Sequence, residues 1–265
     1  MKKIYTTGLV EKDGVETEYV HFGSGEKPLV ILPGLGIKSV IPSAKAIAEA
    51  YAAFDEDYSV YLFERRRNVP DGYTTKDMAD DTVGAMRAVG IEKADIFGVS
   101  QGGMIAQLVA ALYPETVRRL VIASSVSKIP ENTKNEFEKW IDLACTASSE
   151  ELTDAFSRAI YSDGFYSKYG KAIIMMNGEI SGDERSRFVT LAKAALGFDA
   201  EREAERIKCP VLVLGSKGDK LFPEETLTKT AKLLRAEIYL YDGFGHAVYD
   251  EAPDIKDRIK GFLER

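Results

Sequence analysis

Gly98-Val99-Ser100-Gln101-Gly102 is the stretch of this 265-residue sequence that decides the fold. An apolar run, Ala94-Asp95-Ile96-Phe97, precedes it, and an apolar stretch from Gly103 to Leu112 follows it. A serine on such a strand-to-helix turn adopts a strained backbone conformation that pushes its hydroxyl out of the sheet. Glycine is required two residues before and after the serine, because a Cβ there would collide with the turn. The stretch therefore predicts a nucleophilic Ser100 at the N-terminus of a helix, where the helix dipole favours negative charge.

Composition and charge exclude several classes of protein. Apolar residues make up 45% of the chain and charged residues 29%, which is typical of a soluble globular protein. The net charge of −7 disfavours a nucleic-acid partner. The start at Met1 has no apolar run long enough for a signal peptide, and no stretch is long enough to span a membrane. Cys145 and Cys209 have no spacing that indicates a metal site or a redox pair, so we expect reduced thiols, no metal, no cofactor and a cytoplasmic location.

Short apolar runs alternate with helical stretches, which predicts an α/β fold. One expected helix runs from Thr74 to Val89, where Thr74 and Asp77 have the spacing of a capping box, and another runs from Pro253 to Leu263. The expected strands are 3–10, 15–22, 28–32, 59–63, 94–97, 119–123, 210–215 and 237–241.

The alternation stops after residue 126. From 127 to 206 the apolar residues recur at helical spacing, and no convincing strand is found. We therefore expect a core formed by residues 1–126 and 207–265, with an all-helical insertion over 127–206 after the sixth strand.

A serine nucleophile needs a base within hydrogen-bond reach, and the chain has only two histidines. His21 lies in the expected N-terminal hairpin. His246 follows a predicted strand in a glycine-rich loop, at the edge where α/β sheets place their sites. Asp219 follows another strand at the same edge, and the order Ser100, Asp219, His246 is that of one known lineage of catalytic triads. Asp242 and Asp250 also lie near the histidine, but they are so close to it in sequence that we expect them to cap a turn and a helix.

An oxyanion hole needs two converging N–H groups. The Gln101 N–H directly follows the nucleophile. The second N–H is expected from Pro33-Gly34-Leu35-Gly36, where the glycines let the main chain approach a substrate, and we assign it to Leu35.

With these residues, the chain resembles the α/β-hydrolase superfamily over nearly its whole length. The segment from Gly98 to Met104 is similar to the nucleophile elbow of its small, cap-bearing microbial serine hydrolases, such as enol-lactonases and esterases. The resemblance implies a mostly parallel eight-stranded sheet flanked by helices, and it makes the insertion a cap domain. Two loops depart from the family pattern. Pro33 replaces the usual histidine, and 64–69 replaces Asp-x-Arg-Gly-x-Gly.

Two groups of residues leave alternatives open. Arg65-Arg66-Arg67 either binds a substrate carboxylate or pairs with surface acids. Trp140, Phe165, Tyr166 and Met175 either line an apolar acyl pocket or hold the helices of the insertion together, and Gly34 is a further expected substrate contact.

The sequence predicts a serine hydrolase that cleaves a small-molecule carboxylic ester, lactone or thioester through an acyl-enzyme on Ser100. The same residues also serve acyl transfer, amide cleavage and carbon–carbon bond hydrolysis or elimination. A slow-turnover ligand-binding receptor and an inactive scaffold are further alternatives on this fold. The oligomeric state is left open.

Overall fold

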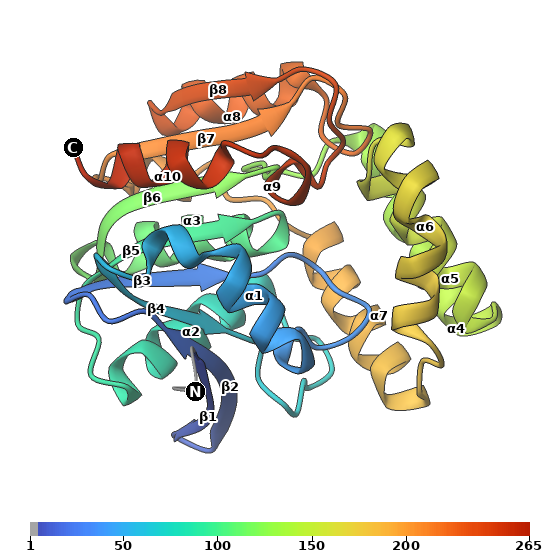
Figure 1. Ribbon diagram of the computed structural model, residues 1–265, viewed down its shortest axis with the longest axis horizontal. Helices are drawn as coiled ribbons and strands as arrows, with labels where there is room; N and C mark the ends of the chain where they lie inside the picture. The colour runs from blue at the N-terminus through green and yellow to red at the C-terminus, as the bar shows by residue number, and fades with distance from the viewer. Residues whose placement is uncertain (1–4) are drawn as a thin grey trace.

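Eight strands form one sheet in the computed structural model, which describes residues 5–265. The strands are β1 (Tyr5–Lys12), β2 (Val15–Phe22), β3 (Lys27–Leu32), β4 (Tyr58–Phe63), β5 (Ala94–Val99), β6 (Val117–Ala123), β7 (Val211–Ser216) and β8 (Glu237–Tyr241). Their order across the sheet is β1-β2-β4-β3-β5-β6-β7-β8 (Figure 1). The β1–β2 and β2–β4 pairs are antiparallel, and all other neighbouring pairs are parallel. The predicted mostly parallel, eight-stranded sheet is confirmed.

The first hairpin shows how the strand ends differ from expectation. The expected first strand began at Lys3, and residues 3 and 4 lie outside the described residues. The strand continues to Lys12 because it pairs with β2 along its whole length. Asp13 and Gly14 form the two-residue turn, with positive φ values of 53° and 78° that match the twist of the flanking strands.

Helices cover both faces of the sheet, so the parallel strands are buried on both sides. Successive strand residues contribute to two separate apolar clusters: Leu29 and Ile31 to one, Val30 and Leu32 to the other. The helices that flank the sheet are α1 (Ala44–Ala50), α2 (Thr75–Ala88), α3 (Gln101–Leu112), α8 (Glu224–Leu234), α9 (Val248–Glu251) and α10 (Ile255–Leu263). The cluster with Leu29 includes residues of α1, α9 and α10, and the cluster with Val30 includes residues of α2, α3 and α8.

The expected helices 74–89 and 253–263 are present with small shifts. Thr74 is the N-cap of α2 and forms the predicted capping box with Asp77. The last helix, α10, begins only at Ile255, and the short helix α9 precedes it. Four short 3₁₀ helices are η1 (Ile41–Ser43), η2 (Ala52–Phe54), η3 (Pro114–Thr116) and η4 (Glu203–Arg206).

Four α-helices, followed by η4, occupy the chain between β6 and β7. They are α4 (Glu131–Thr146), α5 (Ser149–Ile160), α6 (Asp163–Asn177) and α7 (Gly182–Leu196). Serine side chains cap α5, α6 and α7: each hydroxyl accepts from the N–H three residues on, at Glu151, Phe165 and Glu184 respectively. The four helices, which we call the helical segment, lie together beside the end of the sheet where β6 and β7 finish (Figure 1).

Trp140 lies at the centre of the packing in the helical segment. Its side chain is 1% exposed, and its ring lies 5.0 Å from that of Phe137 and 4.8 Å from that of Phe156. The Phe156 ring in turn packs edge-on against Phe188 of α7. Of the two alternatives for Trp140, these contacts favour the one in which it holds helices together.

Replacing Trp140 by alanine should lower the free energy of unfolding by about 3–5 kcal/mol, because the change leaves a cavity among aromatic rings. Trp140→Phe should cost less, since it keeps a ring and removes an Nε1–H that has no hydrogen-bond partner within residues 5–265. Urea unfolding followed by circular dichroism measures both. A loss under about 1 kcal/mol for the alanine variant would contradict tight packing at this position.

Candidate active site

Ser100 lies on the sharp turn between β5 and α3. Its φ of 51° and ψ of −117° form a strained conformation for a residue with a side chain. A Cβ at Gly98 would lie 2.4 Å from the Gly102 carbonyl oxygen, and one at Gly102 would lie 2.0 Å from the Leu32 carbonyl oxygen. Both glycines are therefore required by the close approach of backbone to backbone. The predicted collision within the turn applies to Gly98, whereas Gly102 is required by its approach to the end of β3.

His246 lies between Ser100 and Asp219. Its Nε2 is 2.9 Å from the Ser100 Oγ, and its Nδ1 is 2.9 Å from the Asp219 Oδ2. His246 is only 2% exposed, and the Asp219 side chain is buried as well. A carboxylate on Nδ1 fixes the proton at that nitrogen, so Nε2 is free to accept the serine proton. The structure thus places His246 within hydrogen-bond distance of both other predicted residues, Ser100 and Asp219.

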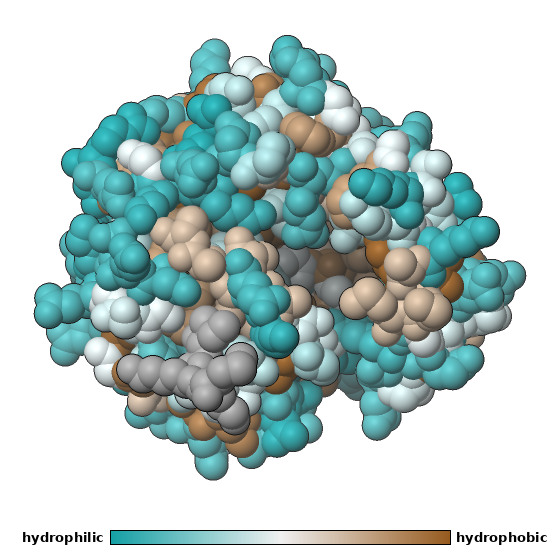
Figure 2. Space-filling model, in the orientation of Figure 1, coloured by the Kyte–Doolittle hydropathy of each residue, from teal (hydrophilic) through white to brown (hydrophobic). Residues whose placement is uncertain are grey.

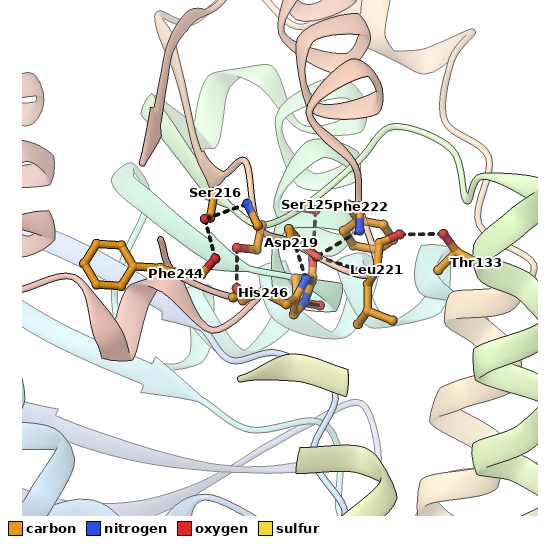
Figure 3. Close-up of polar contacts among 12 residues, drawn as sticks. Ser125, Thr133, Ser216, Asp219, Leu221, Phe222, Phe244 and His246 are labelled. Atoms are coloured by element: carbon orange, nitrogen blue, oxygen red, sulfur yellow. Dashed lines mark hydrogen bonds and ion pairs between the residues drawn. The ribbon is translucent and has the colours of Figure 1, made fainter. Parts of the chain in front are cut away.

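The Asp219 carboxylate is held at both oxygens. While Oδ2 contacts His246, Oδ1 accepts hydrogen bonds from the N–H groups of Leu221 at 2.8 Å and Phe222 at 2.9 Å (Figure 3). The Phe222 ring also packs edge-on against the imidazole, with ring centroids 5.2 Å apart. The contacts of Oδ1 fix the orientation of the carboxylate, and with it the direction in which Oδ2 faces the histidine.

The loop that carries His246 is anchored to two other parts of the chain. The Ser124 hydroxyl donates to the His246 carbonyl oxygen at 2.5 Å. The Ala247 N–H donates to the Ile160 carbonyl oxygen at 2.7 Å, at the end of α5. The histidine is therefore held from the sheet side and from the helical segment at the same time.

The loop after β3 lies directly beside the nucleophile. A Cβ built on Gly34 would lie 3.3 Å from the Ser100 Cβ. Within residues 5–265, neither the Leu35 N–H nor the Gln101 N–H donates a hydrogen bond to the protein. Gln101 is the first residue of α3, where N–H groups have no partner in the helix. Both N–H groups therefore lack a protein acceptor in this range, and one of them directly follows Ser100.

A family comparison agrees with this arrangement. The family model described as alpha/beta hydrolase fold matches residues 27–253. This chain belongs to the alpha/beta hydrolase family. The matched region includes Ser100, Asp219 and His246, and the predicted resemblance is confirmed.

Individual relatives of this hydrolase are distant. The pyrrolizixenacetamide deacetylase of Xenorhabdus hominickii is 28% identical over 186 residues, 68% of each chain. The proposed carbamate hydrolase RutD of Caulobacter segnis is 28% identical over 268 residues, 98% of this chain and 99% of its own length. The solved structure of the enol-lactonase from Burkholderia xenovorans LB400 superimposes with a TM-score of 0.84 at 19% identity, over 97% of this chain and 100% of that one.

Loop 64–69, one of the two loops that depart from the family pattern, places its three arginines in three different environments. Arg66 lies 3.7 Å from Asp81, and the exposed Arg67 lies 3.9 Å from Glu16 and from Glu18. For these two arginines, the contacts match the alternative of pairing with acids. Arg65 does not pair with a surface acid, because its side chain is buried with Glu64 and points inward to Gly34 and Gln101.

Arg65 is 6% exposed, and its Nη2 donates to the Gly34 carbonyl oxygen at 3.1 Å and to the Gln101 Oε1 at 2.9 Å. Burial lowers the pKa of its guanidinium to about 10, so it stays charged at neutral pH. Sequence reasoning missed this role. The one available signal was the charged pair Glu64-Arg65 directly after the apolar strand β4.

The other predicted substrate contacts lie on α6. Phe165 is half-buried and stacks on Tyr161 with centroids 4.6 Å apart. Met175 is 78% exposed, so in this structure its side chain neither packs between helices nor is enclosed in a pocket. The reason is that Met175 lies near the end of α6, on a face that no other described element covers. Figure 2 shows the surface hollowed between the sheet side of the molecule and α6, with apolar residues bordering the hollow.

Clusters of metal-binding side chains and membrane-spanning helices are both absent from residues 5–265. This range contains no group of three or more His, Cys, Asp or Glu side chains that could hold a metal ion. No helix in it is long and apolar enough to cross a membrane. Cys145 and Cys209 are both free, and burial raises the pKa of Cys209 to about 11.

Proposed function

We propose that this protein is a serine hydrolase that cleaves a small-molecule carboxylic ester, lactone or thioester. One observation carries the proposal: the buried His246 lies 2.9 Å from the Ser100 Oγ on one side and 2.9 Å from the Asp219 carboxylate on the other. A serine hydroxyl becomes a nucleophile when such a base can take its proton.

In the proposed reaction, the Ser100 Oγ attacks the acyl carbon while its proton moves to His246 Nε2. Asp219 stabilises the imidazolium, and the Leu35 and Gln101 N–H groups bind the oxyanion that forms on the carbonyl oxygen. The bond to the leaving group then breaks, and His246 returns the proton to it. Water hydrolyses the acyl-enzyme by the same steps, which frees the acid and Ser100.

We further propose that residues 127–206 form a cap over this site, on a core made of 1–126 and 207–265. Contacts of the segment with site loops support this: Ile160 binds the His246 loop, and Thr133 of α4 donates to the Leu221 carbonyl oxygen at 2.5 Å (Figure 3). In this proposal the cap limits the access of water and selects the substrate.

Amide or carbamate cleavage by the same residues is the second candidate. The names of two relatives, a deacetylase and a proposed carbamate hydrolase, favour it. The proton that His246 would return to the leaving group suits an amine as well as an alcohol.

A substrate panel tests the proposal and separates the two candidates. It contains p-nitrophenyl esters of increasing acyl length, simple lactones, acyl thioesters, p-nitroacetanilide and an aryl carbamate. We expect turnover of at least one ester, lactone or thioester, together with labelling of Ser100 by a fluorophosphonate probe. Turnover of the anilide or carbamate alone would move the assignment to the second candidate. Labelling without any turnover would indicate a ligand-binding protein, and no labelling would contradict both candidates.

A further inference from the structure

Arg65 contacts Gln101, one of the two residues that we assign to the oxyanion hole, and Gly34, which directly precedes the other, Leu35. One nitrogen of its guanidinium, Nη2, donates to the Gly34 carbonyl oxygen and to the side-chain oxygen of Gln101. Gly34 and Leu35 share a planar trans peptide unit, in which the C=O and the N–H point in opposite directions. Fixing the Gly34 carbonyl therefore also fixes the direction of the Leu35 N–H.

Gln101 carries the second N–H donor, and both polar atoms of its side-chain amide form hydrogen bonds. It is 1% exposed, its Oε1 accepts from Arg65, and its Nε2 donates to the Leu191 carbonyl oxygen on α7 at 2.7 Å. The first residue of α3 is thus tied both to Arg65 and to the helical segment.

The position of Arg65 is itself fixed by its neighbours. Its Nη1 lies 3.7 Å from the Glu64 carboxylate. The same carboxylate lies 3.3 Å from the guanidinium of Arg187 on α7 and accepts from the Val40 N–H at 3.0 Å. Two guanidinium groups and one carboxylate leave a net positive charge here, and a buried positive charge favours a nearby oxyanion.

We propose that Arg65 is the positioning residue of the oxyanion hole, in which a single guanidinium nitrogen aligns the Leu35 N–H through the Gly34 carbonyl and the Gln101 N–H through the Gln101 side chain. The proposal rests on the proposed function above. It gives loop 64–69, which differs from the family pattern, a role in stabilising the oxyanion and not in binding the substrate.

The test compares Arg65→Met and Arg65→Lys with Arg66→Met as the matched control, all assayed on the best substrate of the panel. Loss of one oxyanion donor costs about 10²–10³ in kcat, so we expect Arg65→Met to lower kcat about 100-fold with KM within about threefold of wild type. The lysine ammonium ends one bond short of the Nη2 position, so Arg65→Lys should keep the charge but recover kcat only in part. Arg66→Met should leave kcat within about threefold, because Arg66 contacts Asp81 and not the site.

Inhibition by a trifluoromethyl ketone that matches the acyl group distinguishes positioning of the oxyanion hole from a purely structural role. A purely structural role of Arg65 would leave the inhibition constant of this ketone unchanged. Its adduct with the serine carries an oxyanion, so its inhibition constant should rise in parallel with the loss of kcat/KM across the Arg65 variants. Combining Arg65→Met with Gln101→Leu should lower kcat by less than the product of the two separate losses, because both changes remove the same hydrogen bond.

The outcomes separate this proposal from the proposed function. If Ser100→Ala keeps its activity, the serine mechanism itself is wrong. If Ser100→Ala is inactive but a folded Arg65→Met or Arg65→Lys variant has wild-type kcat, the role of Arg65 is overturned and the serine mechanism stands. An Arg65 variant that loses kcat but keeps wild-type affinity for the trifluoromethyl ketone would overturn it as well. If circular dichroism shows that Arg65→Met does not fold, Arg65→Lys tests the proposal by the same two measurements, kcat and the inhibition constant of the trifluoromethyl ketone.

Discussion

Replacing Ser100 by alanine is expected to abolish hydrolysis, with kcat falling about 10⁴- to 10⁶-fold. The hydroxyl is the only part of the side chain that this change removes, and it is the group that His246 Nε2 contacts at 2.9 Å. No covalent acyl-enzyme can form without it, so fluorophosphonate labelling should disappear as well. Steady-state kinetics on the best ester of the panel and mass spectrometry of the labelled protein measure the two effects.

Ser186→Ala is the matched control, because Ser186 is an exposed serine on α7. It should leave both labelling and kcat unchanged. Retention of more than about a tenth of wild-type kcat in the Ser100→Ala variant would show that another group is the nucleophile.

The second large effect is expected for His246→Ala, with a loss in kcat on the order of 10⁶-fold. The imidazole takes the serine proton and returns it to the leaving group, so its removal stops both halves of the reaction. Backbone contacts of the loop, such as the Ala247 N–H to the Ile160 carbonyl oxygen, do not involve the ring and should persist. Thermal unfolding should therefore show a folded variant, while the ester assay shows the loss.

The other histidine of the chain provides the control for this prediction. His21 lies in β2, where its Nε2 is 3.0 Å from the Ser59 Oγ and its ring lies 4.4 Å from that of Tyr61. His21→Ala should keep wild-type kcat. A large loss in the His21 variant, with activity intact in His246→Ala, would reverse the assignment of the base.

Most of the candidate site could be predicted because each residue carries a local signal. Ser100 lies on a turn in which Gly98 is dictated by a backbone contact only a few residues away, at Gly102. Asp219 and His246 each follow a parallel strand, and the carboxyl ends of such strands meet at one edge of the sheet. The position of Asp219 and His246 in loops after such strands therefore indicated that their side chains would come together with Ser100.

The three arginines of loop 64–69 could not be assigned in this way. Arg65, Arg66 and Arg67 are chemically identical and adjacent, yet one is buried beside the site and one is exposed. Which of them turns inward depends on acceptors that lie 31 and 36 positions away, at Gly34 and Gln101.

The sequence by itself determined the α/β architecture, the elbow at Ser100 and the helical character of 127–206, because these depend on hydrophobic periodicity and on steric limits between near neighbours. Only the tertiary structure decided that Trp140 is buried between helices while Met175 is exposed on α6. The apolar spacing of both residues is equally compatible with either environment. Their fate is set by which helices pack against each other, and that depends on contacts between segments far apart in the chain.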